Sequence, residues 1–380
     1  MTRLYVGTKK GLFRFDRAND GAWNVAETAF LGDPVPMLLP RRDGRTVHAA
    51  LQHGHFGAKM HVSHDGGASF DEGTTPAYPE KPEGFEDLCP MRKIERPWSL
   101  ELTWALEEGT PDQEGRLWCG TIPGGLFRSD DGGGSWTLVR SLWDRPERTQ
   151  HWMGGGYDFP GIHSVLVDPR DGRHVVVGVS CGGAWRTRDD GATWKQTAHG
   201  MRSDYAPDAE AARFPESQDP HRIAACTASP DVLWCQHHNG IFRSTDAGAS
   251  WTEIEGVEPS AFGFAVAAHP SDPRTAWFVP AIKDERRIPV DGRVVVTRTR
   301  DGGQSFETLR AGLPQDHAYD LVYRHALDVD GAGDTLALGS TTGNLWVSED
   351  GGDRFETVSN SLPPILCVRF GPALDPADTN

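Results

Sequence analysis

The sequence lacks any apolar run approaching the length of a membrane span, and it lacks long Ala/Leu/Glu/Lys-rich periodic segments typical of helices. Its six cysteines are scattered and contain no Cys-x-x-Cys pair, so we expect reduced core residues rather than a disulfide framework. The first residues enter a strand pattern without a charged-then-apolar leader. These absences predict a cytoplasmic protein without membrane spans.

Positive charge is also scarce. The 38 Lys and Arg residues stand against 54 Asp and Glu residues, which gives a formal net charge of −16. This balance argues against nucleic acid or an anionic membrane as a partner. Glycine, with 44 residues, and tryptophan, with 13, are abundant instead. Together with the missing helical segments, this composition predicts an all-β chain with many turns.

One turn pattern dominates the chain: Ser/Thr, any residue, Asp, any residue, Gly, any residue, Ser/Thr, then Trp or Phe. Its copies are Ser63–Phe70, Ser129–Trp136, Thr187–Trp194, Ser244–Trp251, Thr299–Phe306 and, in weaker form, Ser348–Phe355. Asp-x-Gly between two strand patterns indicates a hairpin, because glycine adopts positive φ without a clash. The carboxylate can accept hydrogen bonds from nearby N–H groups. We therefore expect a structural role for Asp65, Asp131, Asp189, Asp246, Asp301 and Asp350.

The repeated turns resemble the Asp-box, or BNR-repeat, family of β-propellers, and the resemblance covers essentially the whole chain. The chain is similar to uncharacterised bacterial members that carry the label glycosyl hydrolase or exo-sialidase. The family also includes sialidases, xyloglucan-cleaving glycosidases, the sortilin ectodomain and a photosystem II assembly factor. The resemblance implies a propeller whose repeated turns lie on the face opposite the active site.

Four antiparallel strands make one blade of such a propeller. The clearest set is Ile162–Asp168, His174–Ser180, Gly183–Thr187 and Thr193–Thr197. Further inner strands are predicted at Val35–Leu39, Trp98–Trp104, Arg222–Thr227, Phe264–His269 and Tyr319–Arg324. The last blade combines three strands from the N-terminal part, Arg3–Thr8, Leu12–Phe15 and Ala22–Ala26, with Ile365–Phe370. The prediction is one seven-bladed β-propeller domain over residues 1–380, with no open sheet edge.

The chain between the repeated turns is longer than four short strands require. Thr74–Pro97, Arg140–Gly161 and Ala198–Pro220 connect an outer strand to the next inner strand, and Ile282–Gly292 connects a second strand to a third. In an up-and-down blade, both kinds of connection lie at the end opposite the repeated turns. Long loops on a rigid scaffold usually carry function, so this face is the predicted working face.

Histidines, aromatic residues and charged residues gather on the predicted working face, around an expected central funnel. The residues expected to contact a substrate are His53, His55, Trp98, His151, Trp152, Tyr157, His163, Tyr205, His221, Arg222, His237, His238, Arg286 and Tyr319. Such a set suits a sugar, which stacks on aromatic rings and hydrogen-bonds sideways. Each member also has a purely structural interpretation: the histidines can bond loop backbone, and Trp98 and Trp152 can be core or loop residues.

Hydrolysis of a glycoside normally needs two carboxylates. The candidates are Glu101, Asp158 and Asp320. Glu101 lies among apolar residues, which would raise the pKa of an unpaired carboxyl group. The alternative is a salt bridge from Glu101 to Arg96 or Arg222, because buried charges usually pair.

Sialidase chemistry is not supported by the residues. The Arg-Ile-Pro letters of that family occur only at Arg287–Pro289, in a late insertion, and no arginine triad or Tyr/Glu pair can be assigned. His53 with His55, or His237 with His238, could ligate a metal, but no Cys/His framework supports it, so neither a metal nor a cofactor is predicted. Two functions remain: a glycoside hydrolase or carbohydrate-binding protein using the funnel, or a non-catalytic scaffold that docks a protein or peptide on the long loops.

Overall fold

The structure is a computed structural model that describes residues 2–372. These residues form seven four-stranded antiparallel sheets, the blades of a seven-bladed β-propeller, so the predicted fold class is confirmed. The chain divides into two compact units, which are described separately below. Unit 2 spans Thr74–Gly256, and unit 1 consists of the chain before and after it. Among the described residues, no helix is both long and apolar enough to cross a bilayer.

Unit 1 contains four blades. Their strands are β1 (Arg3–Thr8), β2 (Gly11–Arg17), β3 (Trp23–Ala29) and β28 (Ile365–Phe370); β4 (Met37–Pro40), β5 (Val47–Gln52), β6 (Ala58–Ser63) and β7 (Asp71–Gly73); β20 (Gly263–Ala268), β21 (Ala276–Pro280), β22 (Val296–Thr299) and β23 (Glu307–Leu309); β24 (Leu327–Val329), β25 (Leu336–Gly339), β26 (Leu345–Ser348) and β27 (Glu356–Ser359). Two 3₁₀ turns, η1 (Gly54–Phe56) and η4 (Val290–Gly292), lie in loops of this unit.

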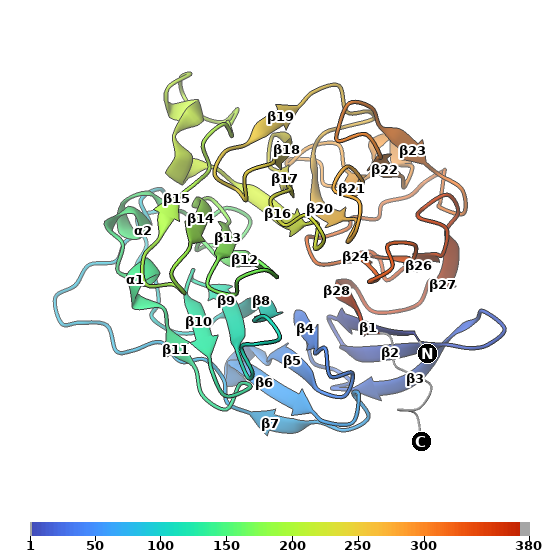
Figure 1. The fold of residues 1–380 in the computed structure, drawn as a ribbon, viewed down its shortest axis with the longest axis horizontal. Helices are drawn as coiled ribbons and strands as arrows, with labels where there is room; N and C mark the ends of the chain where they lie inside the picture. The colour runs from blue at the N-terminus through green and yellow to red at the C-terminus, as the bar shows by residue number, and fades with distance from the viewer. Residues whose placement is uncertain (1, 373–380) are drawn as a thin grey trace. The chain divides into compact units, whose positions relative to one another are not determined.

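One blade of unit 1 joins distant parts of the chain. β28 pairs antiparallel with β1, and Val368 lies opposite Val6 (Figure 1). The resulting sheet order is β28-β1-β2-β3, as predicted from the three-plus-one strand count. Pairing β1 with β28 satisfies backbone groups that an edge strand would leave open.

Unit 2 contains three blades. Their strands are β8 (Leu102–Glu108), β9 (Leu117–Ile122), β10 (Leu126–Ser129) and β11 (Thr137–Leu138); β12 (Ile162–Val167), β13 (Val175–Val179), β14 (Gly183–Thr187) and β15 (Lys195–Gln196); β16 (Pro220–Ala225), β17 (Leu233–His237), β18 (Gly240–Ser244) and β19 (Thr252–Ile254). The three longest predicted insertions all belong to this unit. They contain α1 (Arg140–Trp143), α2 (Pro146–His151) and the 3₁₀ turns η2 (Ala211–Arg213) and η3 (Pro215–Ser217) (Figure 1).

Two predicted inner strands were misplaced. The strand predicted at Tyr319–Arg324 is wrong, because the inner strand of that blade is β24, at Leu327–Val329. Residues 319–324 instead form an irregular segment in which the Leu321 N–H donates to Thr341 Oγ1 at 3.2 Å. The strand predicted from Trp98 begins only at Leu102, because the Trp98 indole N–H is bonded to Asp87 Oδ2 at 2.9 Å in the preceding loop.

The repeated turns share one hydrogen-bond pattern, seen in the turn between β14 and β15. Asp189 accepts the Thr193 N–H at 2.8 Å and the hydroxyls of Thr187 and Thr193 at 2.8 and 2.6 Å. These bonds hold the pKa of Asp189 at about 2. Thr187 Oγ1 accepts the Gly191 N–H at 2.9 Å. The other five Asp residues accept the same bond from the N–H four positions on, so all six carboxylates are hydrogen-bonded within their turns.

Removing the buried hydroxyl of such a turn tests its contribution. Thr187 is buried, and Thr187→Val keeps its shape while leaving the Gly191 N–H without its acceptor. We expect the free energy of unfolding to fall by about 1–3 kcal/mol, the range for an unsatisfied buried polar group. Denaturant unfolding measures the change. Thr245→Val, at the exposed variable position of the next turn, is the matched control and should change stability by less than about 0.5 kcal/mol.

Candidate functional site

The inner strands of unit 2 share an irregularity that defines the candidate site. In β8, β12 and β16 the pairing register shifts at Trp104, His163 and His221, respectively. A β-bulge re-aims a side chain and is frequent beside functional sites. The rings of Trp104 and His163 meet edge to face, with centroids 5.6 Å apart. The three bulges therefore place aromatic or imidazole rings at the end of the inner strands that the long insertions reach.

Glu101 directly precedes β8, and its backbone N–H donates to the Ile122 carbonyl at 3.2 Å. Its pKa is raised, first because partial burial of the carboxyl group penalises the charged form, and second because of the negative charge of Asp158. Leu102, Trp104 and Ile122 form the apolar cluster beside it. The prediction of a raised pKa is thus confirmed, and the structure brings Glu101 and Asp158 into one electrostatic environment.

Asp158 comes from the insertion between β11 and β12. It is exposed and forms an ion pair with Arg92 of the preceding insertion. Tyr157, 47 % exposed, packs edge to face on Trp104 with centroids 5.1 Å apart. This insertion thus supplies an ion-paired carboxylate and an accessible aromatic ring beside a carboxyl group with a raised pKa.

The two arginines considered as partners of Glu101 form bonds with other groups. Arg96 is buried and pairs with Asp87 Oδ1 at 2.7 Å. Arg222 donates to the His163 carbonyl at 2.9 Å, while His163 Nδ1 bonds Ser164 Oγ at 2.9 Å. Arg222 and His163 therefore support the inner ends of β12 and β16.

A second cluster lies at the start of β16. Asp219 Oδ2 is 3.5 Å from His221 Nε2 and 3.5 Å from His238 Nδ1. The His238 ring packs edge to face on both His221 and Tyr205, with centroids 5.4 Å apart in each pair. The Tyr205 hydroxyl donates to the Ser217 carbonyl at 2.5 Å.

The loop carrying Tyr157 and Asp158 adjoins this second cluster. A Cβ placed on Gly155 would lie 2.8 Å from Cys181 Sγ and 3.8 Å from Asp219 Oδ2. Arg92, which pairs with Asp158, also donates to the Gly155 carbonyl at 3.5 Å. The carboxyl pair and the Asp219 cluster therefore flank the same loop.

Several residues of unit 2 expected to contact a substrate are structural. Trp152 is fully buried in the hydrophobic core against Trp185, so its assignment as a binding residue is wrong. His237 and His163 are also fully buried. The pKa of His237 falls to about 3, chiefly through burial, and its ring nitrogens face two backbone N–H groups. His151, in α2, packs on Phe214 instead.

The remaining predicted residues lie in unit 1. Asp320 is buried, and its Oδ1 accepts hydrogen bonds from Ser340 at 2.7 Å, from Thr342 and from Asn344 at 2.7 Å. These bonds shape the turn between β25 and β26, so we correct its assignment from catalytic to structural. The other four residues are accessible: Tyr319 is 61 % exposed, His53 Nδ1 lies 3.4 Å from Asp33, and His55 and Arg286 are on the surface.

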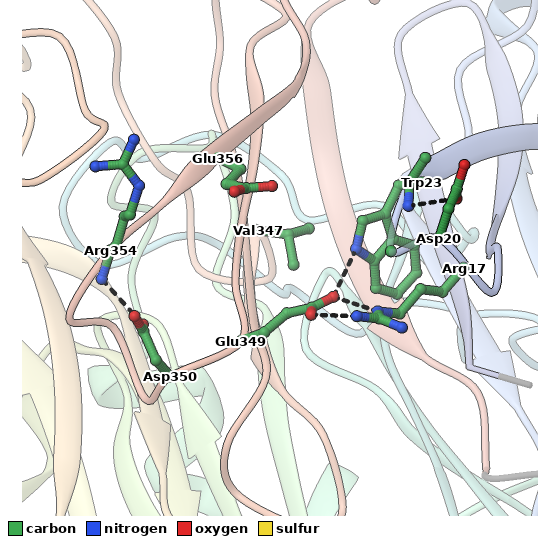
Figure 2. A pocket seen from close by; sticks show the side chains of 10 residues that line it. Arg17, Asp20, Trp23, Val347, Glu349, Asp350, Arg354 and Glu356 are labelled. Carbon is green, nitrogen blue, oxygen red and sulfur yellow. Dashed lines mark hydrogen bonds and ion pairs between the residues drawn. The ribbon is translucent and has the colours of Figure 1, made fainter.

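A pocket of about 520 Å³ in unit 1 opens at the repeated-turn end of its blades. Figure 2 shows that Arg17 and Trp23 point toward the Glu349 carboxylate, which accepts hydrogen bonds from both. Asp350, the aspartate of the last repeated turn, accepts the Arg354 N–H at 2.9 Å. The charged groups in this pocket bond one another and stabilise the turns. The pocket is therefore a weaker candidate for a functional site than the side chains around Glu101 and Asp219 in unit 2.

Sequence reasoning missed Trp104, Asp219 and Arg92 as members of the site. The signal for Trp104 was present, since Trp104-Ala105-Leu106, His163-Ser164-Val165 and His221-Arg222-Ile223 have one pattern: a ring, a small or polar residue, then an aliphatic one. The structure aligns His163 and His221 with Trp104 rather than with Trp98.

No protein-family model matches the chain. It is 24 % identical over 226 residues to the oligoxyloglucan-reducing end-specific xyloglucanase of Emericella nidulans, covering 52 % of this chain and 24 % of that protein. It is 29 % identical over 147 residues to a xyloglucanase of a Paenibacillus species, covering 35 % of this chain and 13 % of that protein.

The fold is similar to the crystal structure of the GH74 xyloglucanase from Xanthomonas campestris. The TM-score is 0.62 at 18 % identity, over 94 % of this chain and 52 % of that one. The chain thus spans about half of this solved structure and at most a quarter of the curated relatives it matches. The protein is a β-propeller similar in sequence to parts of two xyloglucanases.

Proposed function

We propose that the protein hydrolyses a glycosidic bond, with Glu101 as the general acid and Asp158 as the second carboxylate. The observation that carries this proposal is the difference between their environments: burial and the Asp158 charge raise the pKa of Glu101, whereas Asp158 is held in an ion pair by Arg92. A carboxyl group with a raised pKa next to a second carboxyl group held by an arginine is an arrangement that suits an acid and a nucleophile or base.

The aromatic surface beside the pair supports a sugar as substrate. Tyr157 is half exposed and rests on Trp104, which fixes the orientation of the phenol ring. A pyranose ring packs its apolar face on such a side chain while its hydroxyls bond polar neighbours. The sequence similarity to two xyloglucanases supports a β-glucan with xylose branches as the first substrate class to test.

The test is a hydrolysis assay on xyloglucan oligosaccharides, unbranched β-glucan and sialylated oligosaccharides, with proton NMR of the first anomer released. We expect turnover of a β-glucan type of substrate and none of the sialosides. The hydrolysis proposal would be contradicted if the wild-type protein released no new reducing end from any glucan. If a thermal shift showed at the same time that the protein binds a glucan, carbohydrate binding without hydrolysis would be its function.

A second function, docking of a protein or peptide, is favoured by exposed apolar side chains in the first insertion of unit 2. Phe85, Leu88, Met91 and Ile94 are each 39 % or more exposed within a short stretch. Clustered apolar side chains of this kind mark interaction surfaces. Shortening Thr74–Pro97 should then abolish binding of the partner, whereas shortening Ile282–Gly292 in unit 1 should not; equal binding by both deletions would exclude this docking site.

A further inference from the structure

We propose that Asp219, His221 and His238 bind a divalent transition-metal cation of the Zn²⁺ type. The proposal is independent of the hydrolysis proposed above. A carboxylate oxygen and two imidazole nitrogens are the ligand types that such cations prefer. One ligand atom from each residue lies within 4.8 Å of the other two.

The distances within the cluster fit a shared cation better than direct hydrogen bonds. Asp219 Oδ2 lies 3.5 Å from both His221 Nε2 and His238 Nδ1. An N–H···O hydrogen bond is about 2.7–3.2 Å long. Two ligands bound at about 2.1 Å to a tetrahedral ion lie about 3.4 Å apart. The distances from Asp219 Oδ2 to the two imidazole nitrogens are therefore already close to those between ligands of one cation.

The carboxylate is oriented in advance. Asp219 Oδ1 accepts the Cys181 N–H at 3.0 Å and the Ser180 hydroxyl at 3.2 Å, which directs Oδ2 toward the imidazoles. The Asp219 carbonyl accepts the His238 N–H at 3.0 Å, which ties the start of β16 to the turn after β17. Hydrogen bonds that fix a ligating carboxylate typically raise metal affinity by tenfold or more.

The site is accessible from one side. Asp219 and His221 are buried, but the His238 side chain is 22 % exposed and lies against the half-exposed ring of Tyr205. Three protein ligands leave at least one position of a Zn²⁺ ion for water or for an oxygen of a bound molecule. Gly155, in the loop that also carries Asp158, passes beside Asp219.

Metal binding by the chelator-treated full chain tests the site without any glycoside. Zn²⁺ is titrated by calorimetry, and Co²⁺ by its visible absorption, with wild-type protein, Asp219→Asn and His238→Ala. His174→Ala is the matched control: its imidazole also lies beside two carboxylates, at 4.0 Å from Asp168 and 3.6 Å from Asp171, at the repeated-turn end of unit 2.

We expect wild type and His174→Ala to bind one equivalent and to melt at a higher temperature with metal. Asp219→Asn and His238→Ala should lose affinity by at least about tenfold, together with the Co²⁺ bands. The melting temperature of each variant without metal shows whether it is folded. No stoichiometric binding by wild type, or equal affinity in folded Asp219→Asn and His238→Ala, would overturn the proposal and leave an ion-pair network at this position.

Discussion

Replacing Glu101 by Gln is expected to lower kcat on a glucan substrate by about 10²–10⁴-fold, the usual contribution of a general acid. The amide has nearly the same shape as the carboxyl group but cannot deliver a proton to the leaving oxygen. Because Glu101 precedes β8 and lies outside the regular strands, the variant should remain folded. KM should change much less than kcat, since the lost interaction belongs to the transition state.

The pH profile gives an independent check on this role. A general acid works in its protonated form, so activity should fall as pH rises through the pKa of Glu101. Burial and the Asp158 charge raise that pKa, so the basic limb should lie above the value of about 4.3 for an ordinary glutamic acid. Asp158→Asn removes the negative charge that contributes to the raised pKa of Glu101. The basic limb of any residual activity should therefore move to lower pH.

Asp320→Asn is the control for both substitutions. Its carboxylate is buried and bonded to the turn between β25 and β26. We therefore expect loss of stability but kcat within a few-fold of wild type in the folded protein. A Glu101→Gln variant as active as Asp320→Asn would remove Glu101 from the mechanism.

The largest expected effect on stability comes from Asp87→Ala. Asp87 is fully buried and bonds Arg96 at 2.7 Å, Arg148 at 2.8 Å and the Trp98 indole N–H at 2.9 Å. Removing the carboxylate leaves two buried guanidinium groups without their counter-charge. Breaking a buried ion pair from one side typically costs about 3–5 kcal/mol, and we expect a loss of this size in the free energy of unfolding.

Glu95→Ala provides the comparison for Asp87→Ala. Glu95 lies in the same insertion but pairs with Lys81 at the surface, so its removal should change stability by no more than about 1 kcal/mol. Arg96 also donates to the Trp152 carbonyl, just before the loop that carries Asp158. Asp87→Ala should therefore reduce hydrolytic activity even at temperatures at which the variant is still folded. A stability loss equal to that of Glu95→Ala would show that the buried triad contributes little.

The fold was predictable because its strongest signals are local. In each repeated turn the hydrogen bonds join residues two to four positions apart, as between Thr187, Asp189 and Thr193. A pattern of eight residues therefore contains nearly all the information that forms the turn. The blade that contains both β28 and β1 could be predicted from the number of strands. The N-terminal part supplies only three strands, so a four-stranded blade needed its fourth strand from the C-terminal part.

The site was less predictable because its members come from different blades. Trp98 was chosen over Trp104 because sequence spacing does not reveal the bulges that align Trp104, His163 and His221. Asp219 was missed because its meeting with His238 depends on the pairing of β16 with β17. Trp152 was predicted to bind substrate and Asp320 to be catalytic, because the burial and the hydrogen bonds of these side chains are not visible in the chain order.

By itself, the sequence determined the seven four-stranded blades, the pairing of β1 with β28, the hydrogen-bonded turns around six aspartates and the direction of the pKa shift of Glu101. These depend on short-range bonds, on strand counting and on a carboxyl group next to apolar residues. Tertiary structure alone decided which rings meet at the bulges and that Asp219 faces His221 and His238, and it assigned Asp87, Trp98 and Asp320 to structural bonds. Such choices rest on register and on packing between insertions, where a shift of one residue exchanges a buried side chain for an exposed one.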